Sequence, residues 1–330
     1  MTDASVVRRT STTAVPAEVP ADLAAPGVAR SEVVAAVDIG GTRIKAALVD
    51  RSYGVLAQTT TPTPADIGAD IGGAVAATVK ALLGSVPPEQ SAHLVGCGVV
   101  VPGLVDEARG VGLYSTNLGW RDLDIRAQVE SSLHLPAVVG HDVRAGLLAE
   151  SRLGSAQGHR QVLFMPLGTG IAGALLLDGH VVSGDGWAGE LGHVVVDPSG
   201  PTCPCGQRGC LEVIASAGAI ERIYAAQSPV ALSAEDISLR AAAGEALASS
   251  VWARAVRALG QAIVMTVTLT GVDLVLVGGG LSQSGEVLLK PLRDDVAGRL
   301  TFQRPPTIQR AGLGDRAGSL GAACLIWDAL

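Results

Sequence analysis

Aromatic residues are scarce in this chain of 330 residues and make up only 3% of it. Proteins that bind single-stranded nucleic acid stack the bases on aromatic side chains, so the composition argues against such a surface. The net charge of −7 argues in the same direction, because neutralising many phosphates requires a basic face and no cluster of lysines and arginines occurs here. We therefore expect no nucleic-acid partner.

Long apolar runs are also lacking. No uninterrupted run approaches the roughly 18 to 20 residues that cross a membrane, and the most apolar segment, Ile263 to Val277, is broken by threonines and by Asp273. The residues before Val33 are rich in Ala, Pro, Thr and Ser, without apolar periodicity and without the hydrophobic core of a signal peptide. The sequence thus predicts a disordered leader at 1–31, no membrane partner and a cytoplasmic location.

Glycine, in contrast, is abundant, with 42 residues, and apolar residues make up 48% of the chain. This composition favours an α/β protein with many tight turns between strands and helices over a helical bundle. A chain of this length also exceeds one typical core, so we expect two domains.

Cysteine is rare but concentrated. Three of the five cysteines, Cys203, Cys205 and Cys210, lie within eight positions, and His193 lies ten residues before the first of them. Three thiolates and one imidazole form the closed tetrahedral set of a structural Zn²⁺ site. The alternatives are a disulfide with a spare thiol, which a reducing compartment disfavours, and buried cysteines that only fill space. The sequence predicts a zinc-bound loop over 193–210.

Two segments repeat one arrangement of strand, glycine-rich turn and strand. The first, VVAAVDIGGTRIKAALVD from Val33, carries DIGGT at 38–42, and the second carries LGTG at 167–170 between strands expected at 161–166 and 171–177. Glycine lets backbone N–H groups approach phosphate oxygens closely, although Gly-Gly is equally a favoured hairpin turn. The chain therefore holds two candidate phosphate loops, as duplicated βββαβα halves around one cleft would produce.

Two further motifs follow expected strands. A strand over 137–140 ends in His141 and Asp142, and a strand over 273–277 ends in the glycines at 278–280. Ligands of α/β sheets gather at the carboxyl ends of strands, so Asp142 is a candidate to face a cleft and the glycines let a flat ligand lie against backbone. Asp142 is equally suited to cap its helix, and the glycines to form a plain turn. Helices are expected at 66–83, 123–133, 245–270, 286–300 and 314–329, with 117–120 in a loop.

Together these motifs resemble the ROK family of sugar kinases and repressors, within the actin-like, hexokinase-type ATPase superfamily. The resemblance runs from Val33 to the C-terminus, and its most specific part is GELGH at 189–193 followed by CPCGQRGCLE at 203–212. It implies two ribonuclease-H-like (actin-like ATPase) domains that flank a cleft for ATP and sugar. The smaller would span 32–145, completed by the C-terminal helix 314–330, and the larger would span 146–313 and carry the zinc loop.

The resemblance also implies which residues form the site, with Mg²⁺ bridging the phosphates of ATP near Asp38. ATP would lie against Asp38, Gly40, Gly41, Thr42, Thr169, Gly170, Gly279 and Gly280. The sugar would contact Gly103, Asn117, His141, Asp142, Glu190, His193 and Glu212. His193 would bind Zn²⁺ through one ring nitrogen and a sugar hydroxyl through the other.

The mechanism follows from the chemistry of the acceptor. A primary hydroxyl is a poor nucleophile at neutral pH, so a carboxylate must accept its proton during attack on the γ-phosphorus, and Asp142 is the candidate general base. The implied enzyme is a phosphotransferase acting on the 6-hydroxyl of a hexose, foremost glucose. A homodimer is expected from the family and from base rates.

Two positions depart from the family pattern. His141 stands where the family's glucokinases usually carry asparagine, and an imidazole has a different reach toward ring hydroxyls than an amide has. Ala172 stands where the family often carries glycine.

The substrate therefore stays open among glucose, fructose, an N-acylhexosamine, an amino sugar of the kanosamine type and a cyclitol, with polyphosphate as an alternative donor. A catalytically inactive sugar-binding module is disfavoured by Asp142 and the two loops. A sugar-sensing transcriptional repressor is the less favoured function, because such family members carry an added N-terminal winged helix-turn-helix domain and only 32 residues precede Val33.

Overall fold

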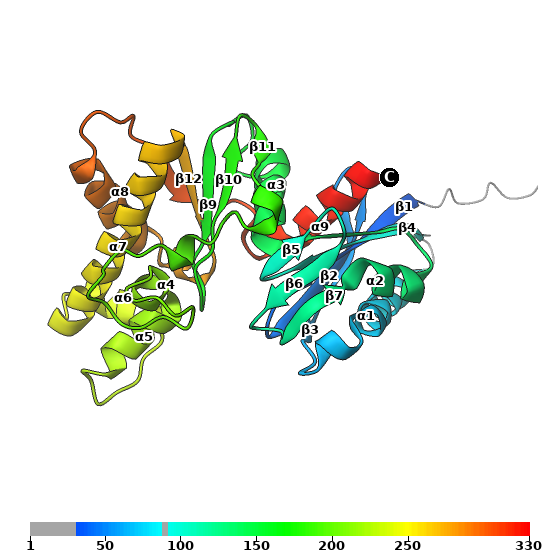
Figure 1. Ribbon diagram of the computed structural model, residues 1–330, viewed down its shortest axis with the longest axis horizontal. Coiled ribbons are helices and arrows are strands. Elements are labelled where there is room, and N and C mark those ends of the chain that lie inside the picture. Colours follow the sequence, from blue (N-terminus) through cyan, green and yellow to red (C-terminus); the bar gives the residue numbers. More distant parts are fainter. Residues whose placement is uncertain (1–30, 88–91) are drawn as a thin grey trace, which may run out of the picture.

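The computed structural model describes residues 31–87 and 92–330, so the predicted leader lies outside the described residues except for Ser31. Two five-stranded sheets organise the chain (Figure 1). The first contains, in spatial order, β3 (Val55–Pro62), β2 (Arg43–Asp50), β1 (Ser31–Ile39), β4 (Ala92–Val101) and β8 (Ala137–His141). The second contains β11 (His180–Val181), β10 (Ala174–Leu177), β9 (Val162–Pro166), β12 (Leu274–Gly278) and β13 (Thr307–Arg310).

The two sheets have the same topology. In the first, β1, β2 and β3 pair antiparallel, whereas β4 and β8 continue the sheet in parallel. In the second, β9, β10 and β11 pair antiparallel, and β12 and β13 continue in parallel. This confirms the predicted duplication, and we refer to 31–141 as the first half and to 162–310 as the second half.

The helices cover both faces of each sheet. They are α1 (Ile71–Ser85), α2 (Ile125–Leu133), α3 (Asp142–Leu153), α4 (Glu212–Ala215), α5 (Ala217–Ala225), α6 (Ala234–Ala242), α7 (Ala246–Thr270), α8 (Glu286–Arg299) and α9 (Ala317–Ala329). Short 3-10 turns occur at η1 (Ile67–Ala69), η2 (Gly184–Gly186), η3 (Leu191–His193), η4 (Gly280–Ser284) and η5 (Gly314–Arg316). In the part of the chain that the structure describes, no helix combines the length and apolarity needed to cross a membrane.

Alternate residues of β1 belong to different cores because successive side chains of a strand point to opposite faces. Val33, Ala35 and Val37 pack with α1 and α2, whereas Val34 and Ala36 pack with α3 and α9. α9 approaches the sheet so closely that a Cβ at Gly98 in β4 would clash with the carbonyl of Ala322. The last helix of the chain therefore covers the first sheet.

α3 and α9 lie between the two sheets (Figure 1). α3 contributes Ala145 to the core under the first sheet and Leu147 to a core with β9, β10 and β12. The predicted boundary between 145 and 146 falls inside this helix, three residues after the candidate base Asp142. The opposite face of the second sheet packs on α4 to α8, in the largest core of the described chain.

Three features differ from the sequence predictions. Residues expected as loop and helix start form a three-stranded antiparallel sheet of β5 (Leu104–Asp106), β6 (Val111–Ser115) and β7 (Trp120–Asp124), so α2 begins at Ile125 instead of 123. β10 begins at Ala174 instead of 171, because the preceding residues bond to segments outside the sheet. α4, α5, α6, β11 and β13 were not predicted.

Glu150 joins α3 to the segment that leads into α9. Its buried carboxylate accepts hydrogen bonds from the backbone N–H groups of Ser155 (2.8 Å), Gly312 (3.2 Å) and Leu313 (2.8 Å). We expect Glu150→Ala to lower the free energy of unfolding by about 3 to 5 kcal/mol, because it leaves buried donors without a partner. Urea denaturation measures this loss. The exposed Glu235→Ala should change it by less than about 0.5 kcal/mol, and equal losses in the two variants would refute the role of Glu150.

Candidate active site

The first glycine loop, Gly40 to Thr42, connects β1 to β2. The N–H of Gly40 donates to the carbonyl of Arg43 (2.9 Å), and the hydroxyl of Thr63 donates to the carbonyl of Gly40 (2.7 Å). Asn117 lies next to this loop, since a Cβ at Gly41 would be 3.6 Å from its Cβ. A predicted sugar residue and a predicted phosphate loop therefore adjoin each other in the first half.

The second glycine loop, Leu167 to Gly170, packs against the glycine triplet at 278–280. The N–H of Leu167 donates to the carbonyl of Gly278 (2.9 Å), and the N–H of Leu281 donates to the carbonyl of Leu167 (3.1 Å). Gly279 has a φ of 73°, and a Cβ there would clash with Leu167. The structure thus brings the predicted phosphate and nucleoside segments of the second half into one unit.

Asp38 is the penultimate residue of β1, beside the first glycine loop, and its carboxyl lies against Gly318. Burial raises the pKa of Asp38 to about 7, and the charge of Asp142 adds to this rise while Lys45 opposes it. Carboxylate oxygens are ligands of the kind that Mg²⁺ prefers, and Asp38 supplies them beside the first glycine loop. The residues present therefore fit a hard divalent cation.

Asp142 is the first residue of α3, yet it does not cap that helix. The cap is His141, whose Nδ1 accepts from the N–H of Arg144 (3.3 Å). Asp142 accepts only from the neighbouring Val143 N–H through Oδ1 (2.7 Å), and its other oxygen has no hydrogen-bond partner among the described residues. His141, and not Asp142, is therefore the N-cap, whereas Asp142 holds one amide of the first turn through Oδ1 and only its other oxygen is left without such a partner.

His141 is buried and lies beside Asp142. Burial lowers the pKa of His141, with Asp142 acting in the opposite direction, so the ring is neutral at neutral pH. Because Nδ1 accepts a hydrogen bond, Nε2 carries the hydrogen, and it lies 3.5 Å from Oδ1 of Asp142. His141 therefore presents a donor to the candidate base.

Two residues that sequence reasoning missed, Glu107 and Arg144, stabilise the junction of β8 and α3 at which His141 and Asp142 lie. Oε1 of Glu107 accepts from the N–H of His141 (3.1 Å) and from Nε of Arg144 (3.0 Å). Arg144 is buried and also donates to the carbonyl of Ala188 (3.1 Å), in the segment that leads to Glu190. A buried arginine in an Ala/Leu-rich helix and a glutamate in a predicted loop carry no sequence signal, because both act through distant contacts.

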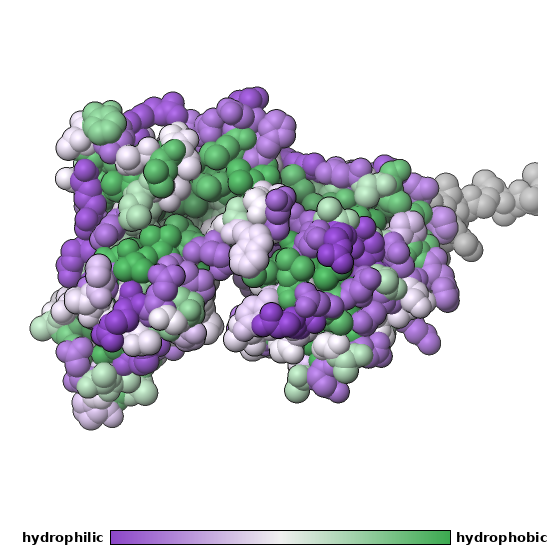
Figure 2. Space-filling model, viewed as in Figure 1, coloured by the Kyte–Doolittle hydropathy of each residue, from purple (hydrophilic) through white to green (hydrophobic). Residues whose placement is uncertain are grey.

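Glu190 and His193 come from the second half, Glu190 lies near His141, and His193 lies beside Glu190. The charge of Glu190 acts on the His141 ring, and its Oε2 lies 3.8 Å from Nε2 of His193. The turn that carries them is held by the N–H of Gly173, directly before β10, which donates to the carbonyl of Gly189 (2.8 Å). Figure 2 shows the molecule hollowed between its two halves.

The remaining predicted sugar residues lie on both sides of this junction. Gly103 lies between β4 and β5, in the first half. Glu212 begins α4 in the second half, and its Oε2 accepts from the N–H of Ile171 (2.9 Å). No hydrogen bond joins the two glycine loops among the described residues.

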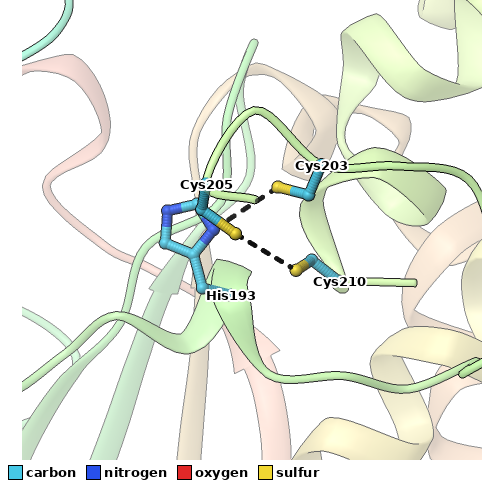
Figure 3. A group of neighbouring side chains, drawn as sticks. All are labelled: His193, Cys203, Cys205 and Cys210. Carbon is cyan, nitrogen blue, oxygen red and sulfur yellow. Dashed lines mark hydrogen bonds between the residues drawn. The ribbon is translucent and has the colours of Figure 1, made fainter. Parts of the chain in front are cut away.

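His193, Cys203, Cys205 and Cys210 form one cluster (Figure 3). All four candidate ligand atoms lie within 4.8 Å of one another, with Cys203 Sγ 3.7 Å from His193 Nδ1 and Cys205 Sγ 3.6 Å from Cys210 Sγ. Tetrahedral Zn–S bonds of about 2.3 Å would place ligand sulfurs roughly 3.8 Å apart. The cluster therefore fits Zn²⁺ and, with all three thiols free, not a disulfide.

The orientation of His193 fits its two predicted tasks. Nδ1 faces the sulfur atoms, whereas Nε2 faces Glu190. A metal on Nδ1 would leave the hydrogen on Nε2, where it is available to a substrate oxygen.

The titration of Asp38 leads to a prediction about stability. The carboxyl titrates at 3.8 in its ordinary state and at about 7 in the folded, ligand-free protein. Above pH 3.8 the carboxyl loses its proton in the unfolded chain but keeps it in the folded protein. The free energy of unfolding therefore falls as pH rises, and it stops falling above about pH 7, where both states are ionised. We expect Asp38→Asn to raise the free energy of unfolding by up to about 4 kcal/mol near pH 8, and by less near pH 5, in urea denaturation.

The control for this experiment is Asp315→Asn. Asp315 is a neighbour of Asp38, but its side chain is 90% exposed. This variant should change stability by less than about 0.5 kcal/mol at either pH. If Asp38→Asn raised the free energy of unfolding equally at both pH values, Asp38 could not be a carboxyl that keeps its proton in the folded protein.

Comparison with known proteins places these features in context. Residues 34–329 match the model of the ROK family. A glucokinase of Thermotoga maritima is 33% identical over 309 residues, which cover 88% of this chain and 96% of that protein. The structure of a ROK family glucokinase from Streptomyces griseus in complex with glucose and AMPPNP aligns with a TM-score of 0.75 at 30% identity, covering 89% of this chain and 98% of that one.

The similarity of fold is not confined to kinases. A ROK family transcriptional regulator, a homologue of the E. coli MLC protein, aligns with a TM-score of 0.81 at 26% identity. The alignment covers 89% of this chain and 77% of the regulator. The residues of the site, and not the fold, must therefore decide between the activities.

Proposed function

The chain belongs to the ROK family, and on that premise we propose that it is an ATP-dependent sugar kinase that phosphorylates the 6-hydroxyl of a hexose, foremost glucose. The observation that carries the proposal is the carboxylate of Asp142, directly after β8, which keeps one oxygen without a hydrogen-bond partner among the described residues while His141 is the N-cap of the helix. A sugar-sensing regulator needs a sugar pocket but no general base. The names of the relatives, two glucokinases among them, support the same activity.

In the proposed mechanism, Asp142 accepts the proton of the sugar 6-hydroxyl as its oxygen attacks the γ-phosphorus of ATP. Nε2 of His141 lies 3.5 Å from Oδ1 of this carboxylate, and the N–H of Val143 holds the same oxygen. Asn117, Glu190, His193 and Glu212 hold the sugar hydroxyls, and Gly103 lets the chain pass close to the ring. Holding both reactants in line supplies much of the rate enhancement.

The nucleotide would lie against the residues predicted for it: Asp38, Gly40, Gly41, Thr42, Thr169, Gly170, Gly279 and Gly280. N–H groups of the two glycine loops would donate to phosphate oxygens and so stabilise charge that develops in the transition state. Asp38 would hold Mg²⁺, which neutralises phosphate charge when bound. Protonated Asp38 would have to release its proton on binding the cation, since its pKa is about 7 without one.

Zn²⁺ would have a structural task in this proposal. Held by His193, Cys203, Cys205 and Cys210, it would fix the loop over 193–210 and the tautomer of His193. The chain's own residues would carry out every step of the transfer. A homodimer is likewise our proposal, from the family and from base rates.

The proposed function is tested by the release of ADP, measured with a coupled assay over hexoses, amino sugars, N-acylhexosamines and cyclitols, with ATP or polyphosphate as donor. We expect turnover with ATP and the highest kcat/KM for glucose. A preference for another sugar would trace to His141, which stands where the family's glucokinases usually carry asparagine. No turnover with any acceptor would refute the kinase.

A further inference from the structure

Glu212 is a predicted sugar residue that also contacts the end of the second glycine loop. It lies two residues after Cys210 and begins α4, and its Oε2 accepts from the N–H of Ile171 (2.9 Å), directly after the second glycine loop. The contact is close enough that a Cβ at Gly170 would lie 2.6 Å from the same oxygen. Any larger residue at position 170 would push the carboxylate away from the loop.

The other hydrogen bonds of the second glycine loop come from the backbone. Gly168 accepts from the N–H of Ala217 (2.9 Å), and Leu167 bonds to Gly278 and Leu281. Among the described residues, Glu212 is the one side chain that hydrogen-bonds to the segment 167–171. Its other oxygen, Oε1, has no hydrogen-bond partner among those residues.

We infer that Glu212 is a positioning residue that couples the binding of the two substrates. This inference rests on the proposed function, in which a sugar hydroxyl donates to Oε1. That bond fixes the rotation of the carboxylate, and Oε2 then holds the N–H of Ile171 and the end of the phosphate loop in one position. With sugar bound, the loop is already ordered, so the nucleotide loses less conformational entropy on binding and binds more tightly. By linkage, bound nucleotide would tighten sugar binding by the same factor.

Glu190 is the matched control for this inference. It is also a carboxylate of the predicted sugar subsite, on the same half of the chain, and it lies beside His193. Its side chain makes no hydrogen bond to the second glycine loop among the described residues. Loss of Glu190 should therefore weaken sugar binding without removing the coupling.

The test measures the dissociation constant of Mg-AMPPNP by calorimetry, with and without saturating glucose, or with the sugar that the acceptor panel identifies. We expect sugar to tighten AMPPNP by at least about 5-fold in the unmodified protein and in Glu190→Ala. In Glu212→Ala the factor should fall to near one. An undiminished factor in Glu212→Ala, or no coupling in the unmodified protein, would overturn the inference.

Hydrogen exchange in the unmodified protein provides a second measurement that does not depend on the folding of a variant. Glucose alone should slow amide exchange in a peptide that spans 167–173, because it fixes the acceptor of the Ile171 N–H. Unchanged exchange there, with sugar bound, would contradict the coupling. A protein that bound no sugar at all would refute the proposed function, whereas independent binding of sugar and nucleotide would refute only the role of Glu212.

Discussion

Replacing Asp142 with Asn lowers kcat by at least about 100-fold, because the amide cannot accept the proton of the sugar hydroxyl. The fold and the affinity for sugar should change little, since an asparagine oxygen can still accept from the N–H of Val143. The expected pattern is therefore a loss confined to kcat, which reports an interaction needed in the transition state. Steady-state kinetics and sugar binding by calorimetry measure the two quantities separately.

Asp328→Asn is the control for that experiment. Asp328 pairs with Arg152, at the far end of α3, through side chains that are half-exposed or partly buried. The Asp328→Asn substitution should leave kcat unchanged and lower the free energy of unfolding by at most about 1 kcal/mol. Near-normal turnover of Asp142→Asn would remove Asp142 from the role of general base.

Zinc removal is expected to have the second large effect. The purified protein should contain about one Zn²⁺ per chain, and a chelator should lower the unfolding temperature by about 10 °C or more and weaken sugar binding. Burial raises the pKa of the Cys210 thiol to about 12, so without a metal this thiol keeps its proton at neutral pH and the loop loses its anchor. Glu190 and Glu212 lie within three residues of two ligands and would move with them.

Metal analysis by mass spectrometry and thermal unfolding test this prediction together. Cys205→Ser should lose the metal, whereas Cys97→Ala, a buried cysteine of β4 outside the cluster, should keep it. A metal-free protein with unchanged stability and activity would contradict the zinc site.

Much of the fold follows from local sequence. The branched residues of β1 and β12 predict buried strands, and the glycines that follow them predict the turns where ligands gather. The spacing of His193 and the three cysteines predicts the cluster because it depends on residues within one loop. The repeat of a strand, a glycine turn and a strand predicts the shared topology of the two sheets.

The rest depends on contacts between distant segments. Asp142 as a cap and Asp142 as a base are equally consistent with the sequence. The structure assigns the N-cap to His141, and the role of Asp142 as a base stays a prediction. β10 starts late because Ile171 bonds to Glu212 and Gly173 bonds to Gly189 instead of joining the sheet. Glu107 and Arg144 meet across 37 residues, and no periodicity predicts such a pair.

The central claim, that this chain transfers a phosphoryl group from ATP to a sugar hydroxyl, is tested most directly by ³¹P nuclear magnetic resonance of the protein with glucose and Mg-ATP. We predict that the γ-phosphate signal is replaced by equal amounts of ADP and a sugar 6-phosphate monoester. Loss of ATP with only inorganic phosphate as product, or unchanged ATP with glucose and every other acceptor of the panel, would contradict the claim.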